Sequence, residues 1–416
     1  MLDGLPTWII AALATAGVII RPFGLSEAVW AVSGAVLLVV LGLLPWHDAL
    51  RAVGTGTDVY LFLTGMMLLS EIARREGLFD WLAALAARRA RGSAARLFLL
   101  IYAVGTVVTV FLSNDAAAVV LTPAVFAVTR AADVKNPLPY LLICAFIANA
   151  ASFVLPISNP ANLVLYASRT PPLLTWLAHF ALPSVLSIGA TLGMLWLTQR
   201  AALGGAISTA VLRPALSGGG RIAAAGIVLT AIVLLVASGL DMQLGLPTAV
   251  AGIASTVAVL AFRREAPWGV LRGVSWAVLP LVAGLFVLVE GLGHSGVLAR
   301  LADLLHRAAQ AGVQETAWGA GILLAVVSNL MNNLPAGLIA ADAIAQARPP
   351  QAVTDALLIG VDLGPNLSVT GSLATILWLN ALRREGQSVG FAQFLKVGAV
   401  VMPPALILAL AGLLLS

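Results

Sequence analysis

Cysteine and charge are both scarce in this chain of 416 residues. The one cysteine, Cys144, excludes an internal disulfide and any cysteine-rich metal site. Only 10% of the residues are charged, whereas soluble proteins carry about a quarter. The four histidines show no metal-ligand spacing: His47, His179, His294 and His306. We therefore expect neither a metal nor another cofactor.

What the chain has in abundance is hydrophobic surface, because 60% of its residues are apolar. A soluble domain could not bury that much, so lipid must be the solvent for most of it. The first residues lack the basic region of a signal peptide, and residues 5–20 are interpreted as a retained first span. The apolar runs predict an all-α polytopic membrane protein with ten spans, near 5–20, 27–46, 57–73, 138–168, 174–198, 222–240, 245–262, 274–292, 353–383 and 391–415.

Two further apolar stretches, 96–130 and 316–346, contain a polar break in the middle. The first break reads Ser113-Asn114-Asp115 and the second Asn332-Asn333-Leu334-Pro335. Each arm has about 15 residues, short for ~30 Å of hydrocarbon at ~1.5 Å per residue. We expect re-entrant hairpins that enter and leave on one side; two ordinary spans joined by a polar loop are the alternative.

The Lys and Arg residues test this topology. With ten spans and two hairpins, 18 of the 23 basic residues fall on one side and five on the other. By the positive-inside rule the richer side is cytoplasmic, and both termini face outward.

The chain also contains an internal repeat. With an offset of 219 residues, the informative matches are Gly65 with Gly284, Glu71 with Glu290, Gly77 with Gly296 and Arg88 with Arg307. Nearly the same offset places Asn114 on Asn332. We predict a first repeat over 1–200, a linker over 201–221 and a second repeat over 222–416. Each half would have an odd number of crossings, so the second would be inverted, as in many transporters.

Four segments place polar backbone at membrane depth, which is tolerated where it lines a buried or watery cavity. They are the two hairpin tips and the breaks in spans 138–168 and 353–383. Each carries a helix-start signal, so four half-helices would aim their N-termini inward. Such a site suits a small oxyanion or a hydroxyl-rich neutral solute; simple capping of kinked helices is the alternative. The candidate binding residues are Ser113, Asn114, Ser158, Asn159, Asn162, Asn332, Asn333, Asn366, Thr370 and Ser372.

Four acidic residues lie within apolar sequence, and intramembrane carboxylates often mark ion or proton paths. Asp115 lies on a hairpin tip beside the predicted site and is the first candidate for proton coupling. Asp362 is the second, as a titrating group or a cation ligand. Glu71 and Glu290 occupy matching positions at span ends, where interfacial anchoring is the simpler role.

These polar segments resemble those of the ion transporter superfamily, and within it the arsenite/antimonite efflux permeases (ArsB type). The resemblance rests on Leu112–Ala116, Pro156–Asn162, Gly364–Asn366 and Thr370–Ser372, in that order along the chain. It implies an inner-membrane transporter that exports arsenite or antimonite by proton antiport and alternating access, with a soluble ArsA-type ATPase as an optional partner. The superfamily's tips often read Ser-Asn-Thr; Asp115 and the Met331-Asn332-Asn333 tip depart from this and favour protons over sodium.

Three alternatives remain at this stage. A sodium/proton antiporter or sodium-coupled carboxylate or anion carrier of the same superfamily differs in solute and coupling ion. An intramembrane aspartyl or metalloprotease would need a Gly-x-Gly-Asp or His-Glu-x-x-His motif, which the sequence lacks. A channel fits the composition, but broken helices in inverted repeats favour alternating access. We expect a transporter and not an enzyme.

Overall fold

The computed structural model describes residues 4–166, 170–211 and 215–415, and all of the regular structure in these ranges is helical. The predicted all-α fold is therefore confirmed. The end of the predicted broken span (167–168), three linker residues (212–214), and Arg169 and Arg213 of the charge count lie outside the described residues.

Every predicted span corresponds to a helix or to a pair of helices. The unbroken spans are α1 (Leu5–Ile20), α2 (Glu27–Val40), α4 (Thr57–Arg75), α10 (Leu173–Gln199), α11 (Gly218–Gly239), α12 (Gly245–Arg263), α14 (Val278–His294) and α20 (Phe391–Leu415). The broken spans are α8 (Leu138–Ala150) with α9 (Pro160–Tyr166), and α18 (Gln351–Leu363) with α19 (Leu373–Arg384). Short helical turns lie within the breaks: η3 (Pro156–Ser158) and η6 (Gly364–Asn366).

The two predicted hairpins are also present. The first is α6 (Ala94–Phe111) followed by the π-helical turn η2 (Ala116–Val120) and α7 (Leu121–Ala131). The second is α16 (Val313–Met331) followed by α17 (Asn333–Ala347). The first arms are longer than expected, with 18 residues in α6 and 19 in α16, and α6 is long and apolar enough to cross a membrane. Among the described residues, five helices are long and apolar enough to cross a membrane, or up to seven if each bent pair of helices counts as one span.

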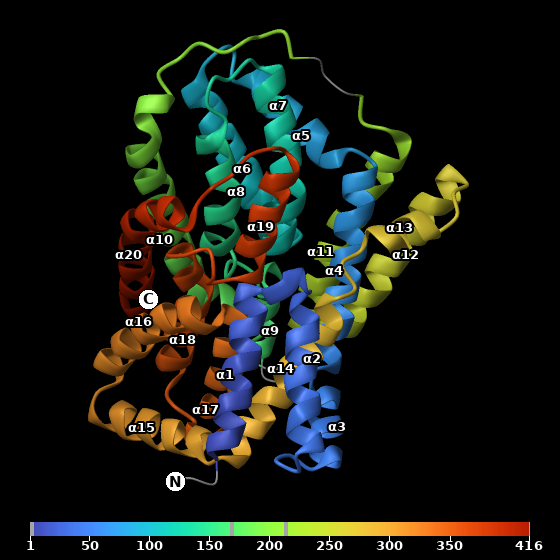
Figure 1. Ribbon diagram of the computed structural model, residues 1–416. Helices are drawn as coiled ribbons and strands as arrows, with labels where there is room; N and C mark the ends of the chain where they lie inside the picture. Colours follow the sequence, from blue (N-terminus) through green and yellow to red (C-terminus); the bar gives the residue numbers. More distant parts are fainter. Residues whose placement is uncertain (1–3, 167–169, 212–214, 416) are drawn as a thin grey trace.

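Contacts at the hairpin ends nevertheless show that each hairpin starts and finishes at the same end of the molecule. The linker after α10 hydrogen-bonds to both ends of the first hairpin: Ile207 N donates to Gly92 O over 2.9 Å, and Ser208 N donates to Ala132 O over 2.8 Å. For the second hairpin, α15 (Val297–Ala311) leads directly into α16, while His306 Nδ1 lies 3.1 Å from Ala347 O at the end of α17. Figure 1 shows the linker, α5 (Leu78–Arg89) and α7 at one end of the molecule, and α15 with the start of α1 at the other.

The helices form two bundles that each combine elements from both halves of the sequence (Figure 1). We call α1, α2, α4, α11, α12 and α14, with the short α3 (Trp46–Thr55) and α13 (Trp268–Gly273), the frame bundle. The core bundle contains both hairpins, both broken spans, α10 and α20. The packing within each bundle is extensive, whereas few contacts join one bundle to the other.

Matching glycines of the predicted repeat have matching roles in the frame bundle. A Cβ on Gly65 of α4 would lie 2.2 Å from Thr248 O of α12, and one on Gly284 of α14 would lie 2.8 Å from the Ala31 carbonyl carbon of α2. Both positions therefore require glycine for close helix packing. Likewise, Gly77 and Gly296 have φ of 71° and 76° immediately before α5 (Leu78–Arg89) and α15. These similarities support the repeat, whose inversion stays a prediction.

The four short helices α3, α5, α13 and α15 were not predicted. α15 carries an exposed ion pair between Arg307 and Asp303, and Leu301 and Leu304 are exposed apolar residues on the same helix. Polar and charged residues interrupt the apolar runs of these helices, so a prediction from long apolar runs does not detect them.

Candidate functional site

The site is built from four helix N-termini in the core bundle. Each polar break of the sequence ends where one of four half-helices begins: η2 with α7, α9, α17 and α19. Helix N-termini carry unpaired N–H groups and the positive end of the helix dipole. An oxygen-rich solute placed between them would therefore meet hydrogen-bond donors from several directions.

Side chains cap all four of these starts, and in three of them a single residue forms the cap. Asn159 is extended, and its Oδ1 accepts a hydrogen bond from Ala161 N over 3.0 Å, with Pro160 as the first helical residue. Ser372 Oγ accepts from Thr375 N over 3.1 Å. In the second hairpin the cap is Asn332 and not Asn333: Asn332 has φ 75° and its Oδ1 accepts from Leu334 N over 3.3 Å.

The first hairpin tip begins its helix differently. Asn114 Oδ1 accepts a hydrogen bond from Asp115 N over 2.9 Å, and Ser113 Oγ accepts from Ala116 N over 3.3 Å. The Asp115 carboxylate is not used in capping. It is therefore free to face the space in front of the helix.

All four N-termini line one small cavity of about 20 Å³, which has room for about one water molecule. The polar residues in its wall are Asn114, Asp115, Asn159, Asn333 and Ser372. Leu63 of α4 and Val278 of α14 complete the wall, so both bundles contribute to it. The wall holds neither Arg nor Lys among the described residues. This deep cavity is uncharged apart from Asp115.

A larger vestibule of about 560 Å³ leads to the deep cavity, with which it shares Leu63, Asp115, Pro160 and Val278. Ser113 also lines it. At its other end are Glu71, Arg74, Arg272, Arg384 and Glu385. Arg74 donates two hydrogen bonds to the Glu71 carboxylate, over 2.8 Å and 2.7 Å, so Glu71 is paired at the mouth of the vestibule. The route into the protein thus runs from basic residues at the mouth of the vestibule to a deep cavity that is nearly neutral.

Asp362 lies beyond the deep cavity, on α18, with 0% of its surface exposed. Its Oδ1 accepts a hydrogen bond from Asn159 Nδ2 over 2.8 Å, and its Oδ2 accepts from Ser152 Oγ over 2.7 Å. Since Asn159 is itself in the cavity wall, this amide connects the buried carboxylate with the cavity. The two acids predicted for proton coupling, Asp115 and Asp362, therefore lie on either side of Asn159.

Five predicted binding residues are absent from the lining of both cavities within the described part of the chain. Their side chains hold the non-helical backbone instead. Asn162 Nδ2 bonds to three carbonyls, Ser158 Oγ donates to Val110 O over 3.0 Å, and Thr370 Oγ1 donates to Asn329 O over 2.8 Å. Asn366 and Asn332 complete this group, through contacts with the Phe146 and Thr370 carbonyls.

Sequence reasoning missed Ser152 and Asn329. Ser152 holds Asp362, as described above. Asn329 of α16 donates to Gly364 O over 2.8 Å and accepts from Ser368 N over 3.0 Å, joining the second hairpin to the break between α18 and α19. Ser152 is one polar residue among apolar neighbours, and Asn329 has only Ser328 beside it, without an adjacent proline or second amide, so the available signal was weak.

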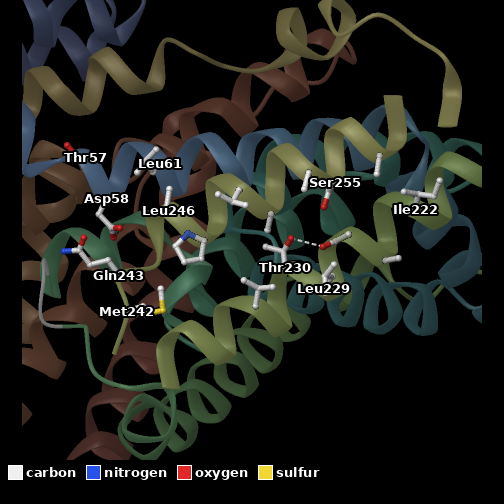
Figure 2. Close-up of a pocket in the computed structure, with 18 residues that line it drawn as sticks. Thr57, Asp58, Leu61, Ile222, Leu229, Thr230, Met242, Gln243, Leu246 and Ser255 are labelled. Atoms are coloured by element: carbon white, nitrogen blue, oxygen red, sulfur yellow. Dashed lines mark hydrogen bonds between the residues drawn. The ribbon is translucent and has the colours of Figure 1, made fainter. Parts of the chain in front are cut away.

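A larger cavity, about 1100 Å³, lies elsewhere, and none of the predicted residues line it. Figure 2 shows it between α11, α12 and the start of α4, with Asp58, Gln243 and Met242 gathered at one end. Leu229, Leu246 and other apolar residues of its wall are exposed at the periphery. It is an apolar groove on the outside of the frame bundle, unlike the polar cavity in the core bundle.

Comparison with known proteins agrees with this architecture. The profile of the family described as "Citrate transporter" matches residues 10–363. An arsenical pump membrane protein of Escherichia coli is 31% identical over 96% of this chain and 95% of its own length. One from Yersinia enterocolitica is 30% identical over 84% of each chain. The crystal structure of the YdaH transporter of Alcanivorax borkumensis superimposes with a TM-score of 0.57 over 99% of this chain and 97% of its own, at 16% identity.

Proposed function

The chain belongs to the citrate transporter family and to the arsenical pump membrane proteins. From this premise we propose that it exports arsenite or antimonite from the cytoplasm. The export is secondary active transport across the inner membrane, coupled to the inward movement of protons. The solute is bound at the deep cavity and reaches the two sides by alternating access.

The observation that carries this proposal is the meeting of four helix N-termini at one cavity without Arg or Lys in its described wall. Trivalent arsenic is a neutral trihydroxide at neutral pH, so its three hydroxyl groups both donate and accept hydrogen bonds. The amides of Asn114, Asn159 and Asn333 and the hydroxyl of Ser372 can replace the water around such a solute. A polyanion would instead call for basic residues.

Thiolate chemistry has no part in this recognition. Cys144 is the only cysteine of the chain and is fully buried in α8, where its Sγ lies 3.9 Å from Tyr140 O. Three thiolates cannot surround the metalloid in a chain with one cysteine. Oxygen and nitrogen groups must therefore bind the solute.

Proton coupling is assigned to Asp115 and Asp362. Asp115 faces both the deep cavity and the vestibule, so a proton on its carboxylate and a solute in the cavity are close enough to influence each other. Asp362 reaches the cavity through Asn159. A protonated Asp362 can accept one hydrogen bond fewer at the protonated oxygen, which frees either Asn159 or Ser152 to rearrange.

The orientation follows from the charges. The vestibule opens among Arg74, Arg272 and Arg384, and the positive-inside rule makes this rim cytoplasmic, with both chain termini outside. The protein is then in an inward-open form. Because the deep cavity has both bundles in its wall and few contacts join them, displacement of the core bundle against the frame bundle is the movement that exposes the site to the other side.

The volume of the deep cavity adds one requirement. About 20 Å³ is too small for a trihydroxide, so the wall must open toward the vestibule when the solute binds. Leu63 and Val278, which belong to the frame bundle and are shared with the vestibule, are the residues whose displacement enlarges it.

A sodium-coupled carboxylate or anion carrier is the second candidate, favoured by the family description and by the oxygen-rich site. The two functions are separated by expressing the chain in bacterial cells that lack their own arsenite exporter. Our proposal expects lower cellular arsenic and growth at higher arsenite than in cells with the empty vector. Unchanged cellular arsenic at confirmed membrane expression contradicts it.

A further inference from the structure

A second group of polar side chains surrounds Asp355, near the start of α18. Tyr166 at the end of α9 donates its hydroxyl to Asp355 Oδ1, and Gln351 Nε2 donates to the same oxygen over 2.6 Å. On the other carboxylate oxygen, Oδ2, the neighbour is His179 of α10, whose Nδ1 lies 2.8 Å away. Three helices thus converge on one carboxylate outside the site described above.

The side chains of His179 and Asp355 differ strongly in burial. The His179 side chain is 31% exposed, whereas that of Asp355 is 3% exposed. The imidazole is therefore the more accessible of the two groups, and a proton can reach Asp355 by way of His179. Histidine is the side chain that most often passes protons in proteins, because either ring nitrogen can carry one.

The group lies at the end of the molecule opposite the vestibule mouth. His179 is in the second turn of α10, whose far end carries the linker, and Asp355 is in the second turn of α18, which follows the α17 terminus beside α15. With the proposed orientation this is the outer end.

Asp355 and Asp362 lie on the same face of α18. Seven residues separate them, which is about two turns and ~10.5 Å along the axis. Leu358 and Ile359 lie between them on that face, and both are 0% exposed. An apolar layer therefore separates the outer carboxylate from the central one, while the vestibule reaches the deep cavity from the other end. An inward-open form is expected to have this combination of a closed apolar layer at the outer end and an open vestibule at the cytoplasmic end.

The other described ionisable groups on the helices packed against α18 form no ion pair or hydrogen bond with Asp355. Glu315 is exposed at the start of α16, Asp342 of α17 accepts a hydrogen bond from Gln346, and Lys396 is near the opposite end of α20. Arg348 is exposed in the turn before α18. The recorded polar contacts of Asp355 come from Tyr166, Gln351 and His179.

We propose that His179 and Asp355 are the outer proton-loading pair of this transporter, which rests on the proton-coupled export proposed above. A proton from the outer solution binds the imidazole, and the Nδ1 proton passes to Asp355 Oδ2, which leaves the imidazole neutral. From Asp355 the proton moves to Asp362 when water enters the layer at Leu358 and Ile359. Tyr166 and Gln351 hold the carboxylate in place during both steps.

The test compares two kinds of arsenite transport by the purified full-length protein in liposomes. Exchange of arsenite between equal pools at equal pH needs no net proton movement, whereas pH-driven transport does. Asp355→Asn should reduce pH-driven transport at least about tenfold and leave exchange within about twofold of wild type. His179→Gln, which keeps the Tyr166 and Gln351 bonds to Asp355, should also slow only pH-driven transport. Asp342→Asn is the matched control and should change neither.

The results separate the inference from the function on which it rests. Equal loss of both kinds of transport in His179→Gln and Asp355→Asn would identify a purely structural cluster and overturn the inference, as would full pH-driven transport by both variants. Absence of arsenite exchange by the wild-type protein would instead overturn the proposed function. Because His179→Gln removes no bond made by Tyr166 or Gln351, it stays informative if Asp355→Asn does not fold.

Discussion

Asn159 Nδ2 donates a hydrogen bond to Asp362 Oδ1 over 2.8 Å, joining residues 203 positions apart in the sequence. The same Asn159 caps α9 through its Oδ1 and lies in the wall of the deep cavity. One amide therefore touches a helix start, a buried carboxylate and the space for the solute. Any change in the charge of Asp362 alters the hydrogen bonds available to Asn159, and this is a direct physical link between proton and solute.

Asp362→Asn tests this link. The amide has nearly the same size and can still accept from Asn159 or Ser152, so the protein should fold, with a loss of about 1–3 kcal/mol for the charge-assisted bonds. We expect pH-driven arsenite transport to stop while arsenite exchange continues. Transport rates in liposomes measure both; pH-driven transport at the wild-type rate would exclude Asp362 from coupling.

Asp115→Asn should abolish proton-coupled export and leave the protein folded and inserted, because the carboxylate takes no part in capping its helix. The measurement is growth of arsenite-sensitive cells at rising arsenite, with membrane expression checked by immunoblotting. Full resistance in cells carrying this variant would refute the role of Asp115.

Two asparagines of the break between α8 and α9 should differ in how their substitution affects arsenite binding. Asn159→Ala removes a group from the cavity wall together with the cap of α9 and a donor to Asp362, so it should weaken arsenite binding as well as stability. Asn162→Ala leaves the carbonyls of Ser152, Leu155 and Pro156 without their donor and should lower stability alone. The second variant should lose about 1–3 kcal/mol of stability per unsatisfied group, visible as a lower thermal midpoint in detergent. A loss of arsenite affinity in folded Asn162→Ala equal to that in Asn159→Ala would contradict the placement of Asn159 alone in the cavity wall.

The different roles of Asn159 and Asn162 show which parts of the site could be predicted from the sequence and which could not. Clusters of Asn, Ser and Pro within apolar segments were enough to locate the four helix starts, because capping is a local interaction. Asn159 and Asn162 look equivalent in the sequence, yet one faces the cavity and the other the backbone, because Asn159 caps α9 whereas Asn162 lies in the first turn of α9 and bonds back to the carbonyls of the break. The contacts of Asp355 with Tyr166 and His179 depend on the packing of three helices and have no local signal.

Helix packing in the frame bundle gives a prediction about stability. Gly65→Ala would place a methyl group 2.2 Å from Thr248 O and force α4 and α12 apart, at a cost of about 1–3 kcal/mol. Gly189→Ala in α10 is the matched control, because nothing lies within 4 Å of its added Cβ. Thermal unfolding in detergent should separate the two variants; equal midpoints would contradict the close packing of α4 on α12.

The proposed orientation can be tested by cysteine labelling. Cys144 is fully buried, so the wild-type chain should give little background. Asn380→Cys lies in the vestibule wall and should react with a membrane-impermeant maleimide from the cytoplasmic side. Asp303→Cys, on exposed α15, should react from the outer side. Reversed labelling of the two sites would reverse the assigned topology.

The central claim is that this protein exchanges a trivalent metalloid hydroxide for protons, and transport by the purified protein in liposomes under an imposed pH gradient tests it most directly. With potassium and choline as the only other cations, we predict that arsenite accumulates in the acidic compartment, while protons leave that compartment and a trapped pH dye records their movement. Arsenite movement that requires sodium, or a pH gradient that collapses without any arsenite movement, would contradict it.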